Sequence, residues 1–151
     1  MAVYPRYRRV NLDGCSLYKT ETRKADAALL PGTFAVINAT DEFANTAAVV
    51  GRMYVVDVGY HQGLGILDAN PIGDSVVGNY WEEGREYAIR VAAGTVWKKD
   101  TPVTLGAGGI GAVGTEGTSI IVGYSQDTVT IGSSPDFIRV RAKFVPATPA
   151  P

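Results

Sequence analysis

The chain has 151 residues, the size of one ordinary domain, and its apolar fraction of 46% is sufficient for a hydrophobic core. Its 14 basic and 15 acidic side chains give a formal net charge of −1 and a pI near 5.8, which argues against a protein whose whole surface binds nucleic acid. The single cysteine, Cys15, excludes an internal disulfide. No apolar run approaches the roughly 20 residues of a membrane helix, and the first nine residues lack the apolar segment of a secretion signal. We therefore expect a protein that is made in the cytoplasm and does not bind membranes.

Residues 1–28 differ from the rest of the chain because arginine, lysine and tyrosine are concentrated there. Arg6, Arg8 and Arg9 surround Tyr7 within four positions. This composition predicts an extended N-terminal arm, which either wraps around its own domain or reaches a partner. A solvated terminus without fixed contacts is the alternative.

Residues 29–144 are predicted to form a β domain, because short apolar runs alternate there with turns rich in glycine, proline and aspartate. Seven or eight short strands at this spacing favour a compact β-barrel or β-sandwich, hence the all-β class. In the last strand, alternation places Phe137 on a wet face with Arg139 and Arg141. Residues 145–151 are proline-rich and predict an extended C-terminal tail. The strands are expected at residues 33–38, 52–58, 87–93, 101–105, 119–124, 128–131 and 136–144, with a helical turn as the expectation for 42–50 and 81–86.

Short internal matches suggest that the domain consists of two related β halves. Residues 58–62 match residues 122–126 at four of five positions, and residues 89–93 match residues 138–142 equally well. A threonine-led apolar strand stands upstream in each half. On this interpretation, Tyr60 and Tyr124 should occupy equivalent positions.

The side chains that could support catalysis or bind a metal are few. His61 is the one histidine and has no second histidine or cysteine at the spacing of zinc ligands. Residues 106–111 fit the glycine pattern of a dinucleotide-binding turn, but the sequence after them cannot form the helix that the motif needs. Asp68, Asn70 and Asp74 carry oxygen ligands suited to calcium, yet such residues are also ordinary turn formers. We therefore expect no catalytic residue, no cofactor and no metal site, and a protein that is not an enzyme.

Aromatic and arginine side chains are the best candidates for contacts with a partner, because they bury large areas at low entropic cost. Trp81 and Trp97 can equally fill the β core. The predicted interface residues are Arg6, Tyr7, Arg8, Arg9, Tyr80, Trp81, Arg85 and Trp97.

Four segments, at residues 24–38, 82–87, 98–106 and 124–127, stand in an order that resembles the capsid decoration (cement) proteins of tailed bacteriophages. The resemblance extends over roughly residues 17–144. It implies a β-barrel or sandwich on the outer capsid surface of the virion, where it clamps neighbouring subunits of the major capsid protein and stabilises the shell. It also implies self-association, as a homotrimer or otherwise a homodimer, and an arm that adds contacts to the shell. Such a protein would be made in the host cytoplasm.

Two other functions remain open. A host-glycan or receptor-binding β module of a phage tail or fibre would present Tyr80 and Trp81 to sugars. A single-strand nucleic-acid binder would use Phe137 with Arg139 and Arg141, although the balanced charge disfavours it.

For the cement function, we predict that removal of residues 1–10 weakens attachment and leaves the β domain folded.

Overall fold

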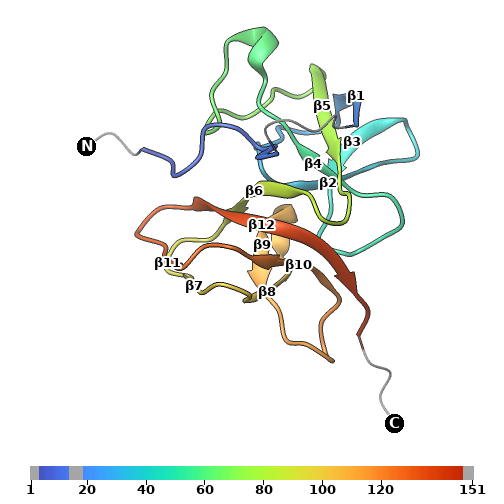
Figure 1. The fold of residues 1–151 in the computed structure, drawn as a ribbon. Coiled ribbons are helices and arrows are strands. Elements are labelled where there is room, and N and C mark those ends of the chain that lie inside the picture. Colours follow the sequence, from blue (N-terminus) through green and yellow to red (C-terminus); the bar gives the residue numbers. More distant parts are fainter. Residues whose placement is uncertain (1–3, 14–18, 148–151) are drawn as a thin grey trace.

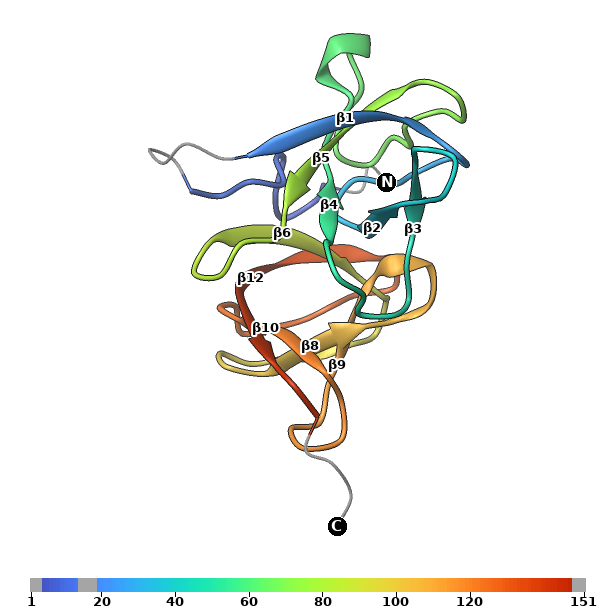
Figure 2. The ribbon, with the colours of Figure 1, turned by 90° about the vertical axis from the view of Figure 1, so that its right-hand side faces the viewer.

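The computed structural model describes residues 4–13 and 19–147, which form two five-stranded closed barrels stacked on one another (Figures 1 and 2). In these ranges the helical segments are two short 3₁₀ turns, so the predicted all-β class is confirmed. None of the helices found there has the length and apolarity to cross a membrane. The elements are β1 (Thr20–Ala25), β2 (Phe34–Ile37), β3 (Glu42–Asn45), β4 (Tyr54–Val56), η1 (Tyr60–Gln62), β5 (Ser75–Tyr80), β6 (Glu86–Val91), β7 (Val96–Trp97), β8 (Pro102–Leu105), η2 (Ala107–Gly109), β9 (Gly111–Val113), β10 (Ile121–Ser125), β11 (Val129–Thr130) and β12 (Asp136–Val145).

The two barrels have the same topology. The first barrel closes in the order β1-β3-β2-β4-β5, and the second closes in the order β6-β9-β8-β10-β12. Each contains one parallel pair, β1 with β3 and β6 with β9, while the other neighbours are antiparallel. Numbered along each half of the chain, the strands therefore follow one order, 1-3-2-4-5. The two halves that the sequence suggested are present, and β7 with β11 forms a separate ribbon in the second half.

The equivalence extends to single backbone hydrogen bonds outside the strand ladders. The amide of Gly32 donates to the carbonyl of Val56 at 2.9 Å, and the amide of Asp100 donates to the carbonyl of Ser125 at 2.7 Å. The amides of the same two acceptor residues also donate: Val56 to the carbonyl of Thr33, and Ser125 to the carbonyl of Thr101, each at 2.9 Å. Three more amide-to-carbonyl bonds of the first barrel have a counterpart in the second. The bond from Thr46 to Phe34 corresponds to that from Gly114 to Pro102, the bond from Asp57 to Val77 to that from Gln126 to Arg139, and the bond from Asn38 to Glu42 to that from Gly106 to Ile110.

These equivalent hydrogen bonds show that most of the sequence matches between the two halves were wrong, because they paired residues that do not occupy equivalent positions. Tyr60 lies in η1, whereas Tyr124 lies within β10, so the two tyrosines are not equivalent. Residues 89–93 and 138–142 belong largely to β6 and β12, which pair with each other in the second barrel, with Ile138 opposite Ile89. The threonines before β2 and β8 do correspond. Short matches misled because barrel strands share one alternating apolar pattern.

Three further expectations are corrected by the strand positions. Residues 20–25, which we assigned to the arm, form β1 and close the first barrel; their alternating exposed side chains gave no apolar signal. Residues 42–45 form β3 rather than a helical turn. Phe137 is fully buried, with the guanidinium carbon of Arg90 4.7 Å from its ring centroid. It is therefore not on a wet face and cannot stack on a base.

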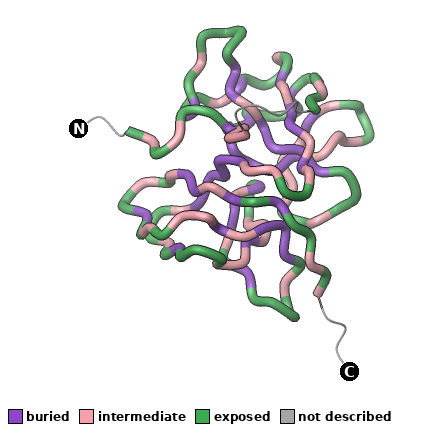
Figure 3. Tube along the Cα trace, in the orientation of Figure 1, coloured by how far each residue is buried: buried purple, intermediate pink, exposed green. Residues whose placement is uncertain are grey.

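Buried residues line the inside of both barrels and the region between them (Figure 3), and one hydrophobic cluster extends across both barrels. One cluster fills the first barrel around Phe43, Tyr54 and Val76. The larger cluster fills the second barrel and also includes Phe34 and Val55 from strands of the first. The outer wall of the first barrel thus packs on the second, and the two barrels share a core.

Candidate interaction surfaces

The arm, defined here as residues 4–13, adds a short strand to the second barrel. Asn11 forms an antiparallel bridge with Tyr87. The amide of Ala88 donates to the carbonyl of Val10 at 2.7 Å, and the amide of Leu12 donates to the carbonyl of Glu86 at 3.0 Å. Because Val10 is fully buried in the shared core, removal of residues 1–10 would take away part of the domain.

The four arm residues predicted at an interface divide into two pairs. Tyr7 donates a hydrogen bond of 2.7 Å to Asp127, and Arg6 lies 3.5 Å from the same carboxylate. Burial and Asp127 raise the pKa of the Tyr7 hydroxyl. Arg8 and Arg9 have exposed side chains. Arg6 and Tyr7 thus hold the arm to its own domain, and Arg8 and Arg9 face outward.

The two tryptophans of the predicted interface lie in the core. Trp97 is fully buried. Trp81 is 7% exposed and its indole nitrogen donates to the carbonyl of Val122 at 3.0 Å. Its ring lies 4.9 Å from Phe34 and 4.8 Å from Tyr87 between centroids. Trp81 therefore joins the two barrels and offers no surface to a sugar.

Tyr80 and Arg85, the other two predicted residues, are half-buried and make contacts within the chain. Arg85 pairs with Glu82, three positions before it. The hydroxyl of Tyr80 donates to Glu21 at 2.5 Å, and the hydroxyl of Tyr54 donates to the other oxygen of that carboxylate at 2.8 Å. These two bonds place Tyr80 in a polar cluster where β1 begins and β5 ends.

The cluster is completed by two arginines. Arg52 and Arg23 approach the Glu21 carboxylate at 3.7 and 3.8 Å, and Arg23 also donates to Asp41 at 2.8 Å. The two hydroxyl donors, more than the two cations, lower the pKa of Glu21, whereas burial and Glu21 raise the pKa of Tyr54. Sequence reasoning missed this cluster because its members are distant along the chain and carry no common motif.

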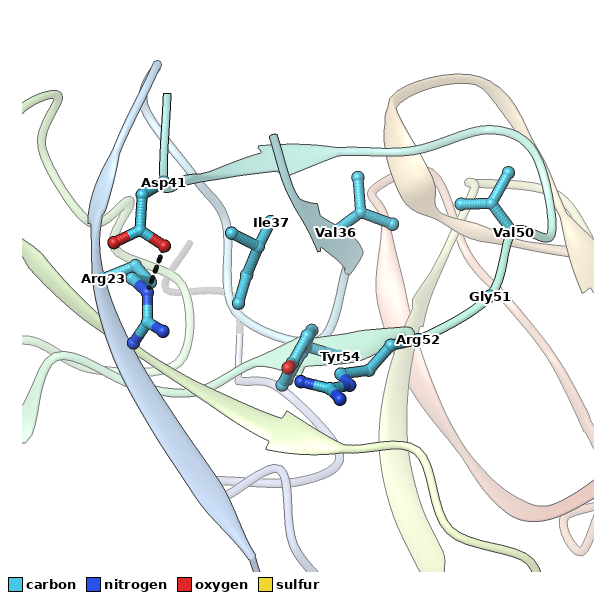
Figure 4. Close-up of a pocket in the computed structure, with 8 residues that line it drawn as sticks. All are labelled: Arg23, Val36, Ile37, Asp41, Val50, Gly51, Arg52 and Tyr54. Atoms are coloured by element: carbon cyan, nitrogen blue, oxygen red, sulfur yellow. Dashed lines mark hydrogen bonds and ion pairs between the residues drawn. The ribbon is translucent and has the colours of Figure 1, made fainter. Parts of the chain in front are cut away.

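A groove of about 640 Å³ lies beside the cluster (Figure 4). The ribbon of β1 forms one side of it, and β2 and β4 lie opposite. Its walls combine apolar and charged side chains: Arg23, Val36, Ile37, Asp41, Val50, Gly51, Arg52 and Tyr54.

A long connection between β4 and β5 projects from the end of the first barrel (Figures 1 and 2). It exposes large side chains, with Tyr60 58%, Ile72 68% and Leu67 40% accessible. The hydroxyl of Tyr60 donates to the carbonyl of Arg8 at 3.3 Å. A second groove, of about 330 Å³, is lined by Pro5 and Arg8 from the arm and by residues 65–68 from the loop. Residues 5–9 and 60–72 are called the arm–loop surface below.

The residues considered for chemistry occupy turns of this same connection. His61 is exposed on η1. Asp68 accepts a bond of 2.7 Å from the amide of Gly65, and Asp74 accepts one of 2.9 Å from Gln62. Asn70 is buried and donates to two backbone carbonyls. Within residues 4–13 and 19–147, no three histidine, cysteine, aspartate or glutamate side chains are grouped to hold a metal ion.

The glycine-rich segment at residues 106–111 forms η2 and the start of β9, so it opens no helix. Gly109 instead allows close contact between the barrels, since a Cβ there would lie 2.4 Å from the carbonyl oxygen of Phe34. Cys15 lies outside the described residues.

No protein-family model and no curated protein matches this chain. Among solved structures, the crystal structure of the N base of head fibre gp8.5 in bacteriophage phi29 is similar, with a TM-score of 0.56 and 14% sequence identity. The alignment covers 84% of this chain and 95% of that chain. At this level of identity the likeness concerns the fold.

Proposed function

We propose that the chain is a structural protein of a tailed-bacteriophage head, and that it decorates the outer capsid surface and clamps neighbouring subunits of the major capsid protein. The observation that carries this proposal is the fold shared with a head fibre base over 84% of the chain. The described polar side chains support it, because their bonds stabilise turns, the arm and the barrels rather than converge on a reactive centre. On this proposal the protein is not an enzyme.

The arm–loop surface is the face that we assign to the capsid. It joins exposed apolar side chains, Tyr60, Leu67 and Ile72, to the exposed cations Arg8 and Arg9. The apolar groups lose water on docking, and arginines form charge-assisted bonds with carboxylates on the shell. A protein that binds the assembled shell and not its separate parts stabilises the shell, and repetition over many sites multiplies the effect.

Co-sedimentation with heads assembled without this protein tests the proposal. We expect the double variant Arg8→Glu/Arg9→Glu to reduce occupancy, and we expect wild-type binding to weaken as salt is added, since the attraction is between exposed charges. Lys98→Glu/Lys99→Glu is the matched control, because it reverses two exposed cations on the second barrel. Absence of wild-type binding to such heads, or equal loss in both double variants, contradicts the proposal.

Self-association belongs to the same proposal, with a homotrimer as the first expectation and a homodimer as the second. Light scattering of the purified chain measures the mass directly. A monomer at all concentrations that also fails to assemble on heads would remove this part of the proposal.

The neighbour's description as the base of a head fibre favours a second candidate, a β module of a phage fibre that binds a host glycan or receptor. Because Trp81 is buried, such a site would have to use exposed rings such as Tyr60. Binding of the labelled chain to host cells, with no binding to heads, would support this candidate over the cement function.

A further inference from the structure

The arm is held to the rest of the molecule in two different ways along its length. Residues 10–13 are bound through the backbone, since the carbonyl of Val10 and the amide of Leu12 both bond to β6. Val10 is also fully buried in the shared core. Among the described residues, no bond between two backbone groups reaches residues 4–9. This half of the arm is held by side chains instead, so it can open at a lower cost than residues 10–13.

The carboxylate of Asp127 is the centre of the contacts that hold residues 4–9. One of its oxygens accepts a bond of 2.7 Å from the Tyr7 hydroxyl and one of 3.0 Å from the amide of Arg139. Arg6 lies 3.5 Å from the same oxygen, and the Asp127 side chain is only 14% exposed. The Tyr7 side chain packs against the edge of the shared core. Because a bond to an ionised and largely buried carboxylate is stronger than one between neutral groups, Asp127 is the principal polar anchor of this segment.

Comparison of the two barrels shows that the barrel itself does not need a carboxylate at this position. The amide of Asp57 in the first barrel corresponds to that of Gln126 in the second, so Val58 stands where the second barrel has Asp127. Val58 is buried in the shared core. The same turn therefore forms with an apolar residue, and the carboxylate is present in the barrel to which the arm is bound.

Residues 4–9 also supply one wall of the groove of about 330 Å³ on the arm–loop surface. Pro5 and Arg8 line it from the arm, and residues 65–68 line it from the loop. Since Arg6 and Tyr7 stand between Pro5 and Arg8 in the chain, their contacts with Asp127 fix the position of this wall. When residues 4–9 leave the domain, Pro5 and Arg8 leave with them, and the groove loses one of its walls.

We propose that residues 4–9 form a flap that opens about the junction of Arg9 and Val10, and that Asp127 is the latch that holds this flap closed. In the closed position the flap completes the groove and presents Arg8 and Arg9 beside the loop. In the open position residues 10–13 remain bound to β6 and the groove is incomplete. A partner that fills the groove therefore binds the closed flap and increases its population. That this partner is a capsid shell rests on the proposed function, whereas the flap and its latch do not.

The rate at which trypsin cleaves the full chain after Arg6, followed by mass spectrometry, tests the proposal, because this rate follows the population of the open flap. Tyr7→Phe keeps the ring and removes the hydroxyl donor, so we expect cleavage to be about tenfold faster than in the wild type. Asp127→Ala should accelerate cleavage at least as much, whereas Asp127→Asn keeps an acceptor oxygen and should lie between Asp127→Ala and the wild type. Tyr124→Phe is the matched control, since it removes a hydroxyl bond of 2.8 Å to Glu116 and should leave the rate unchanged.

Hydrogen exchange at the amides of Leu12 and Ala88, which bond β6 and the arm to each other, distinguishes an open flap from a lost arm. We expect both amides of Tyr7→Phe to exchange as slowly as those of the wild type. Faster exchange in step with faster cleavage would show that the arm detaches as one piece, and wild-type cleavage rates in Tyr7→Phe and Asp127→Ala would show that Asp127 is not a latch. Either result overturns the proposal.

Heads assembled without this protein test the link between the flap and the partner. We expect bound heads to slow cleavage after Arg6 in the wild type. Heads that bind without slowing this cleavage overturn the role of the closed flap in docking. Heads that do not bind would instead remove the proposed function and leave the comparison of the variants standing.

Discussion

At the scale of single residues, Gly32 shows how a turn shared by both barrels becomes an inter-barrel contact in one of them. Gly32 and Asp100 occupy equivalent turns and have φ angles of 78° and 65°. Aspartate is tolerated in this left-handed region, and Asp100 is exposed. A Cβ at position 32, in contrast, would lie 2.7 Å from the Phe137 ring and 3.0 Å from the carbonyl oxygen of Ala88. The second barrel thus requires glycine at position 32.

We predict that Gly32→Ala lowers the free energy of unfolding by about 2–4 kcal/mol, through backbone strain together with the clash. Gly94→Ala is the matched control, because Gly94 has a φ of 74° but no atom beyond its chain neighbours lies within 4 Å of the point that a Cβ would occupy. Gly94→Ala should lower the free energy of unfolding only by the backbone strain, about 1–2 kcal/mol. Urea unfolding measures both, and equal losses would contradict the role assigned to the inter-barrel contact.

Glu21 makes the folding stability of the molecule depend on pH. Its two tyrosine donors and two arginines lower its pKa in the folded chain, whereas a glutamate in an unfolded chain titrates near about 4.3. The stabilisation by ionised Glu21 is therefore complete above the unfolded pKa and is lost as the pH falls through the lower folded pKa.

We predict that Glu21→Gln is less stable than the wild type near neutral pH and that the difference closes in acid. Denaturant midpoints between about pH 7 and about pH 3 measure it. Glu116→Gln is the control, since exposed Glu116 accepts one bond of 2.8 Å from Tyr124 at the surface of the second barrel. A difference for Glu21→Gln that stays constant with pH would show that the carboxylate charge is not what stabilises the cluster.

At the scale of elements, the arm is part of the second barrel over residues 10–12. We predict that Val10→Ala lowers the unfolding free energy by about 1–3 kcal/mol, because a fully buried side chain leaves a cavity. Arg9→Ala, at the preceding exposed position, should change it by less than about 0.5 kcal/mol. Thermal unfolding compares the two, and equal stability of Val10→Ala and wild type would show that the arm is not needed for the core.

The elements that could be predicted from the sequence are those whose strands carry an apolar run or a long alternation, such as β2 and β12. β1 was missed because Thr20–Lys24 is polar and lies on the outside of the barrel. β5 was missed because Gly78 interrupts it, and this glycine is required where a Cβ would lie 2.5 Å from the Phe43 ring. The Glu21 cluster could not be found locally, since it depends on how the barrel closes.

At the scale of the whole molecule, Arg90 ties the two barrels together from a buried position. Its guanidinium donates to the carbonyl of Pro31 at 3.1 Å and to the carbonyl of Ile66 at 2.9 Å. Burial lowers its pKa, and the ring of Phe137 lies beneath it. Because buried donors without partners are costly, these bonds favour one relative placement of the barrels.

The shared core predicts that both barrels unfold in one transition. Trp81 stands in the link between β5 and β6 and contacts Phe34 of the first barrel and Tyr87 of the second. Trp81→Ala should therefore lower the unfolding free energy by about 3–5 kcal/mol for the whole molecule, while Phe144→Ala, at a position 37% exposed, should have a small effect. Calorimetry should give a ratio of calorimetric to van't Hoff enthalpy near one for the wild type. Amide signals of β2 and β10 that disappear at different temperatures would instead show two barrels that fold independently.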